Sequence, residues 1–213
     1  MIQLHDFQLS GNAHKVRNML SLLGVEYERI RIDLLAGKHR REDFMTLNPF
    51  GRVPVLVDDG VVIRDSSAIL VYLGRKYGRG EWLPVDALGE ARVAEWLATA
   101  TSEVSEGPGR ARLIEIFGAA GDLVAARILA HRVFEVFDRH LESNPFLACR
   151  MPTIADIANY TCLALAPEGG IDIRPYKNVL RWFDRLSKLP GFLVAPFSMR
   201  DEKPGRLDGS LAS

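Results

Sequence analysis

Along the first 80 residues, the pattern of hydrophobic and polar positions alternates between strand-like and helix-like segments. Segments 2–7, 27–33, 53–57 and 61–63 are predicted strands, and 27–33 alternates with a period of two. Predicted helices lie between and after these strands, at 11–24, 66–77 and, as a polar candidate, 40–47. The order β-α-β-α-β-β-α predicts an α/β layer whose last two strands form a hairpin.

After Pro84 the pattern becomes helical throughout. Four segments show helical spacing, at 88–106, 128–141, 153–165 and 179–189, and strand patterns of comparable length are missing. The glycine- and proline-containing stretch 78–86 separates the two patterns. We therefore predict an α/β domain over 1–79, an all-helical bundle domain over 86–199, and a polar tail over 200–213.

Composition narrows the class of protein. The 213 residues are 47% hydrophobic and 25% charged, which is ordinary for a globular chain and argues against disorder. Lys+Arg and Asp+Glu are both 27, so the net charge gives no reason to expect nucleic acid or an anionic membrane as partner. The first 80 residues carry 12 basic and 9 acidic side chains. This small excess suits an anionic ligand.

Sequence features also predict where the protein resides. The start, MIQLHDF, lacks the basic and long apolar regions of a signal peptide, and apolar runs stay short of a membrane span. Two cysteines, Cys149 and Cys162, make neither a disulfide framework nor a zinc pattern. We expect a cytoplasmic protein without membrane or metal, in which both cysteines pack as small buried residues.

Three segments of the α/β half carry candidate chemistry. Ser10 and Asn12 stand at the start of the first helix, where the positive helix end favours a thiolate or another anion. Their alternative role is helix capping. A cis Val53–Pro54 bond would turn the Val53 backbone outward to pair with a peptide, whereas a trans bond would make an ordinary turn into a strand.

The third segment is Asp65–Ser66, at the start of the last helix of the α/β half. The N–H groups and the Ser66 hydroxyl suit a carboxylate, and Asp65 suits an ammonium group. A plain N-cap pair is the alternative. Taken together, the three segments predict a zwitterionic peptide ligand with a reactive end near Ser10.

Four motifs in this order resemble those of cytosolic glutathione S-transferases of the bacterial or theta-like, serine-type group. They are LSGNAHKVR, NPFGRVPVL, DSSAI with VYL following, and MPTIADIANY, and the resemblance covers residues 1–197. It implies a thioredoxin-like first domain and an all-helical second domain, in agreement with the periodicity. It also implies glutathione as co-substrate and a homodimer.

The resemblance implies roles for individual residues. Ser10, assisted by Asn12, would donate a hydrogen bond to the glutathione sulfur and favour its thiolate. Val53, ahead of cis-Pro54, would pair with the cysteinyl backbone. Asp65 and Ser66 would hold the γ-glutamyl end, although Asp65 is one methylene shorter than the glutamate frequent there.

Other positions have two interpretations each. His39 and Arg52 lie where a cation would meet the glycine carboxylate; His39 is otherwise a solvated histidine at a helix start. Ser102 and Glu103 resemble positions that reach glutathione across a dimer interface, and are otherwise a solvated helix face. Phe7, Leu9, Arg110 and Ile114 are candidate walls of an electrophile pocket.

Two motifs of the helical half have structural interpretations. The Thr153–Asp156 pair is typical of a capping box, which we assign to folding. The run Gly107–Gly109 interrupts the long helix and would kink it.

The expected reaction is addition of the glutathione thiolate to a small electrophile, with glutathione-dependent reduction of organic hydroperoxides as a side activity. A non-catalytic glutathione-binding or regulatory protein on the same fold is the alternative. Thiol–disulfide exchange through the protein is disfavoured, because position 10 is serine and residues 1–80 contain no cysteine.

Overall fold

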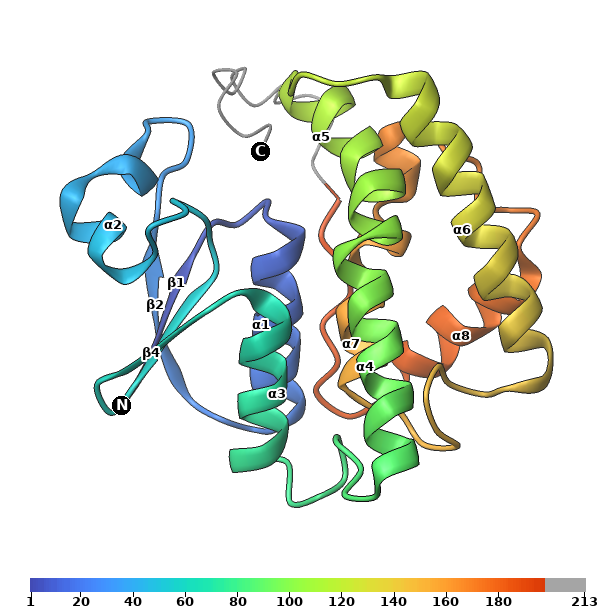
Figure 1. Ribbon diagram of the computed structural model, residues 1–213, viewed down its shortest axis with the longest axis horizontal. Helices are drawn as coiled ribbons and strands as arrows, with labels where there is room; N and C mark the ends of the chain where they lie inside the picture. Colours follow the sequence, from blue (N-terminus) through green and yellow to red (C-terminus); the bar gives the residue numbers. More distant parts are fainter. Residues whose placement is uncertain (198–213) are drawn as a thin grey trace.

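The structure is a computed structural model that describes residues 1–197. The predicted tail over 200–213 and the last two residues of the predicted helical domain lie outside the described residues. Within 1–197, a sheet with its helices occupies one side of the molecule and a group of helices occupies the other (Figure 1).

A four-stranded sheet forms the first half. Its strands are β1 (Ile2–Asp6), β2 (Tyr27–Arg31), β3 (Val55–Asp58) and β4 (Val61–Arg64), in the spatial order β2-β1-β3-β4. β1 and β2 are parallel, whereas β3 is antiparallel to both of its neighbours. Leu4 of β1 and Leu56 of β3 are paired neighbours and are completely buried. These apolar positions of the predicted strands therefore face the core.

Helices cover both sides of this sheet. α1 (Gly11–Leu22) and α3 (Ser66–Lys76) lie between the sheet and the helical half, whereas α2 (Glu42–Leu47) lies on the outer side (Figure 1). A short 3-10 turn, η1 (Lys38–Arg40), precedes α2. This order matches the predicted β-α-β-α-β-β-α layer.

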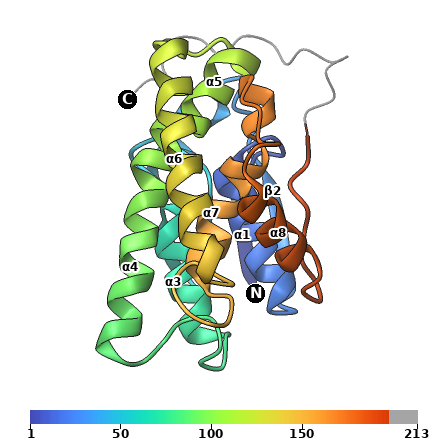
Figure 2. The same cartoon turned by 90° about the vertical axis from the view of Figure 1, so that its right-hand side faces the viewer.

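The second half is helical throughout its described part. Its elements are α4 (Ala87–Thr101), η2 (Ser105–Gly109), α5 (Arg110–Phe117), α6 (Leu123–Ser143), α7 (Ile154–Ala164), η3 (Ala166–Gly169) and α8 (Lys177–Ser187). α4 packs on α7, and α6 packs on η2, α5 and α8; Figure 2 shows α4 and α6 both running along the length of the molecule. The fold class predicted from the sequence, an α/β layer followed by an all-helical part, is confirmed.

The run Gly107–Gly109 interrupts the long helical segment, as the sequence predicted, although α4 already ends at Thr101. The chain passes through a π-helical turn at η2 and continues as α5, a helix that the sequence pattern did not predict. Glycine suits position 107, because a Cβ there would lie only 3.0 Å from the Ala130 nitrogen of α6. The interruption is therefore a close packing contact as well as a bend.

One continuous core joins the two halves. It includes buried residues of the sheet and its helices, such as Leu4, Leu20 and Leu73, and buried residues of the helical half, such as Phe134 and Trp182. α1 and α3 both pack on α7. No helix within residues 1–197 is long and apolar enough to cross a membrane. The division at 79 and 86 stays a prediction, since the two halves share their core.

Candidate active site

The three candidate segments of the α/β half meet where β1 and β4 end and β3 begins, at the same end of the sheet. β1 pairs His5 with Val55, so the chain leaving β1 toward Ser10 passes beside the chain entering β3 from Val53. β3 pairs Val55 with Arg64, so Asp65 and Ser66 follow on the other side of the same segment. The antiparallel pairing of β3 with both neighbours thus brings segments far apart in sequence together.

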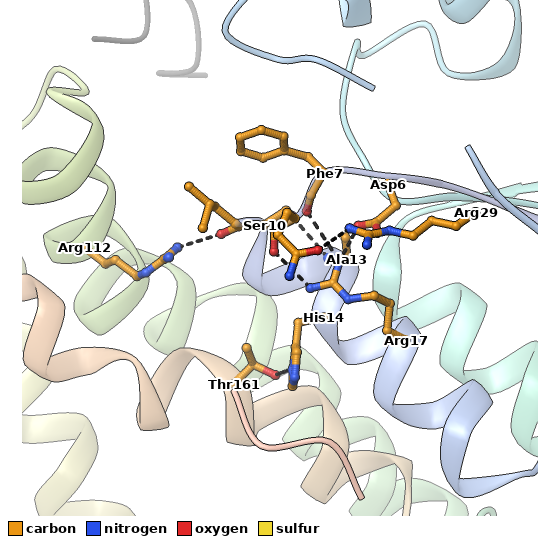
Figure 3. Close-up of polar contacts among 11 residues, drawn as sticks. Asp6, Phe7, Ser10, Ala13, His14, Arg17, Arg29, Arg112 and Thr161 are labelled. Carbon is orange, nitrogen blue, oxygen red and sulfur yellow. Dashed lines mark hydrogen bonds and ion pairs between the residues drawn. The ribbon is translucent and has the colours of Figure 1, made fainter. Parts of the chain in front are cut away.

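Ser10 caps α1 and still has a donor to offer. Its side-chain oxygen accepts a hydrogen bond from the Ala13 N–H at 3.2 Å (Figure 3), and its backbone nitrogen donates to the Phe7 carbonyl at 3.0 Å. A serine hydroxyl has one proton and two lone pairs, so accepting from Ala13 leaves the O–H available for another acceptor. The capping role and the proposed donor role are therefore compatible.

The Val53–Pro54 peptide bond is cis, as one of the two sequence interpretations expected. Asn48, which is buried, holds the preceding loop: its amide nitrogen donates to the Arg52 carbonyl at 2.7 Å, and its side-chain oxygen accepts from the Phe50 N–H at 3.1 Å. This loop therefore has a defined geometry ahead of the cis bond.

Asp65 and Ser66 start α3. The Asp65 carboxylate accepts from the Ser67 N–H at 2.8 Å and from the Ala68 N–H at 3.2 Å, which makes it the N-cap. Its φ of 76° lies in the left-handed region, which is costly for a residue other than glycine and is common at functional sites. Asp65 is exposed, whereas Ser66 is buried. The capping interpretation holds, and the binding interpretation stays a prediction.

A cavity of about 260 Å³ lies between the two halves of the molecule. Four of the predicted site residues line it, namely Ser10, Asn12, Arg52 and Val53. Three of the four predicted pocket walls do so too, namely Phe7, Leu9 and Arg110. Ile114 does not, and its neighbour Leu113 lines the cavity from α5 instead.

Several predicted residues lie outside this lining. His39 is 4% exposed, so its interpretation as a solvated histidine is wrong; its carbonyl lies close to Gly51, which does line the cavity. Ser102 and Glu103 are both exposed, where α4 gives way to η2. The Ser102 hydroxyl donates to the Glu103 carboxylate, and this bond lowers the pKa of Glu103. Their role across a dimer interface stays a prediction.

The sequence pattern missed part of the cavity wall. Four further residues of the helical half line the cavity: Arg112 of α5, Phe117 at the end of α5, Cys162 of α7 and Leu165 just after α7. Cys149 and Cys162 are half-buried rather than fully buried, and Cys162 faces the cavity from α7. Arg112 could have been predicted as a wall residue only if α5 had been predicted as a helix. Within residues 1–197, no group of His, Cys, Asp or Glu side chains is arranged to hold a metal ion.

Two buried polar groups flank the start of α1. His14 is buried, its Nδ1 lies 3.0 Å from the Thr161 Oγ1 of α7, and burial lowers its pKa to about 4, with the nearby Arg17 guanidinium adding to the shift. Asp6, completely buried, pairs with both Arg17 and Arg29 (Figure 3). These contacts join the end of β1 to α1 and β2, and join α1 to α7.

Comparison with known proteins agrees with this geometry. A family model described as the glutathione S-transferase N-terminal domain matches residues 9–76, and one described as the C-terminal domain matches residues 120–190. A curated relative, glutathione S-transferase 3 of Zea mays, is 31% identical over 208 residues, which cover 90% of this chain and 91% of that protein.

Solved structures show the same arrangement. A glutathione S-transferase from Pseudomonas fluorescens Pf-5 superimposes with a TM-score of 0.85 at 28% identity, over 91% of this chain and 98% of that chain. One from Xanthobacter autotrophicus py2 gives a TM-score of 0.84 at 31% identity, over 92% of this chain and 97% of that chain.

Proposed function

The chain belongs to the glutathione S-transferase family and is a glutathione transferase; from this premise we propose that Ser10 activates glutathione as a thiolate for addition to an electrophilic carbon. The Ser10 hydroxyl would donate its remaining hydrogen bond to the glutathione sulfur. A hydrogen bond to the charged form stabilises it and lowers the pKa of the thiol. The amino end of α1 acts in the same direction.

One observation carries this proposal. Ser10 lines the cavity between the halves while its oxygen accepts from Ala13, so its proton is available at the cavity wall. Asn12, on the first turn of α1, lines the same cavity and is proposed as a second donor. The chain would thus supply the sulfur's hydrogen bonds, while the sulfur comes from the co-substrate.

The rest of the tripeptide fits the neighbouring segments. We propose that the Val53 backbone, ahead of cis-Pro54, pairs with the cysteinyl backbone. Asp65 and Ser66 would hold the γ-glutamyl ammonium and carboxylate, because the β3–β4 register places them beside Pro54. Arg52, exposed at the cavity rim, is the proposed partner of the glycine carboxylate, and His39 would support that loop from behind.

Replacing Ser10 tests the central role. Ser10→Ala is expected to raise the pKa of the bound glutathione thiol and to lower kcat at neutral pH at least tenfold, equivalent to about 1.4 kcal/mol. The KM for glutathione should change little, because the other anchors remain. Ser10→Thr keeps a hydroxyl and should recover part of the loss. Thiolate absorbance of the enzyme–glutathione complex, titrated against pH, provides the measurement.

A matched control separates chemistry from folding. Ser187→Ala removes a hydroxyl that donates to the Asp184 carbonyl at the end of α8, a helix that does not line the cavity, and should leave both quantities unchanged. Full conjugating activity in Ser10→Ala would show that Ser10 lacks this role. Tight glutathione binding without turnover, across a broad panel of electrophiles, would instead favour a non-catalytic binding protein.

The electrophile, the subclass and the peroxidase activity extend the proposed function. We propose that a small apolar electrophile occupies the cavity beside Phe7, Leu9 and Phe117, and that the protein belongs to the bacterial, serine-type group. Turnover of an organic hydroperoxide with two glutathione molecules, giving the alcohol, water and glutathione disulfide, would establish the peroxidase activity. A homodimer and a cytoplasmic location complete the proposal.

A further inference from the structure

The segment that carries Ser10 is held by guanidinium groups from two directions. Arg17 of α1 donates to the Phe7 carbonyl at 3.4 Å and to the Gln8 carbonyl at 3.1 Å. Arg112 of α5 donates to the Leu9 carbonyl at 3.0 Å. Three successive carbonyls ahead of Ser10 therefore accept from arginines, one of which comes from the helical half (Figure 3).

The contact from Arg112 acts directly on the peptide group of Ser10. The Leu9 carbonyl and the Ser10 nitrogen belong to one planar unit, which also contains the Ser10 Cα. Holding the Leu9 oxygen therefore restricts the orientation of that plane and, with it, the origin of the Ser10 side chain. Arg17 holds only the two preceding peptide groups.

Arg112 is itself fixed by a buried ion pair. Its Nε donates to the Glu168 carboxylate of η3, and the two side chains are 7% and 6% exposed. Gly169 allows this pairing, because a Cβ at that position would lie 2.8 Å from the Arg112 backbone nitrogen and would push η3 away from α5. Desolvating two charges offsets much of their attraction, so such a pair contributes more to geometry than to stability.

We infer that Arg112, oriented by Glu168, is a positioning residue that sets the geometry of the Ser10 hydroxyl from the helical half of the molecule. This inference rests on the proposed function of Ser10. Because Glu168 balances the charge of Arg112, we attribute the positioning of Ser10 to geometry and not to net charge. Separate nitrogens of one planar guanidinium donate to the Leu9 carbonyl and to the Glu168 carboxylate at the same time. A lysine keeps the charge but has a single nitrogen and cannot make both contacts in the same geometry.

Arg112→Lys provides the main test, with the pKa of the glutathione thiol in the complex as the readout. We expect that pKa to rise and kcat at neutral pH to fall about tenfold, with the KM for glutathione within twofold of wild type. The rate should recover at higher pH, where the thiol ionises without help. Glu168→Gln should shift the thiol pKa in the same direction by a smaller amount, because the neutral amide orients Arg112 less firmly.

Arg127→Lys is the matched control. Arg127 also bridges a carboxylate and a backbone carbonyl: it donates to Glu115 at 3.0 Å and to the Gly169 carbonyl at 2.8 Å. Its carbonyl partner lies in η3 and not in the segment before Ser10, so the thiol pKa should stay at the wild-type value. A general loosening of η3 would instead shift the thiol pKa in this variant as well, and would overturn the inference.

The double variant Ser10→Ala with Arg112→Lys shows whether Arg112 acts through Ser10. The lysine should then cause no further rise in the thiol pKa beyond that of Ser10→Ala alone. A Ser10→Ala variant with an unchanged thiol pKa would overturn the proposed function. If the thiol pKa rises in Ser10→Ala but keeps its wild-type value in Arg112→Lys, only the positioning role of Arg112 is overturned. If Arg112→Lys fails to fold, the same comparison with Glu168→Gln decides.

Discussion

Single residues in this protein combine structural and chemical roles. The Ser10 hydroxyl caps α1 by accepting from Ala13, yet keeps its proton for the cavity. Asp65 similarly caps α3 while its positive φ sets it apart from an ordinary cap. A capping residue and a ligand-binding residue are therefore not exclusive alternatives, and the short motifs that contain both types cannot be assigned to one role from spacing alone.

His14 predicts a dependence of stability on pH. Its pKa is about 4 in the folded protein, because it is buried, and about 6.5 in an unfolded chain. As pH falls from about 6.5 toward 4, the unfolded state binds a proton that the folded state does not, so the free energy of unfolding decreases. The full contribution is up to about 3 kcal/mol.

Urea unfolding at several pH values, at one protein concentration, measures this effect. His14→Gln should reduce the slope of stability against pH between about 4 and 6.5. His131→Gln is the control, since His131 is exposed on α6 and its Nδ1 lies 2.8 Å from the hydroxyl of Tyr176, the residue before α8. An identical slope in His14→Gln and wild type would show that other groups cause the acid sensitivity.

At the scale of elements, α7 is held at its start by the predicted capping box. Thr153 and Asp156 make both reciprocal bonds of that motif. The completely buried Asp156 carboxylate also accepts from the Leu147 N–H at 3.0 Å and from the Trp182 indole N–H at 3.0 Å. The carboxylate thus joins α7 to α8 and to the loop before α7, which the motif by itself did not indicate.

Removing this carboxylate should be costly. Asp156→Ala would leave the N–H groups of Leu147, Thr153 and Trp182 without their acceptor, and we expect a loss of about 3 kcal/mol or more in the free energy of unfolding. Asp184→Ala, which removes an exposed pair with Lys188, should change stability by less than about 0.5 kcal/mol. Denaturant unfolding of both variants makes the comparison; similar losses would contradict the role of Asp156.

At the scale of the whole molecule, the cavity depends on how the two halves pack. α1 and α3 fit against α7, and Arg112 and Glu168 place the helical half against the segment that carries Ser10. Phe50, Val62 and Val71 of the α/β half are exposed apolar side chains that a dimer interface could cover.

Sedimentation velocity at micromolar concentration tests the assembly. We expect a dimer, in which the Glu103 carboxylate, ionised more readily because Ser102 donates to it, can reach the partner's ligand. Glu103→Gln should then weaken glutathione binding a fewfold without changing the sedimentation coefficient. A protein that sediments only as a monomer would contradict both the dimer and the role of Glu103.

The sequence by itself determined the order of strands and helices in the α/β half, the change to a helical pattern after it, and the residues that start α1, α3 and α7. Periodicity and capping are local properties, and residues within one turn or one strand decide them. The same locality explains why α5 was missed. The interruption at Gly107–Gly109 was predicted, but glycine and proline usually end a helix, whereas here the chain packs against α6 and continues through a π turn into α5.

Only the tertiary structure decided which distant residues meet. Arg112 contacts the Leu9 carbonyl across a sequence separation of 103 residues, and Cys162 reaches the cavity from α7. Such contacts depend on the angle and register at which packed helices settle, which side-chain volumes in the shared core determine collectively. The chain's local patterns therefore specify the anchors proposed for glutathione, while the packing of its two halves specifies what surrounds Ser10.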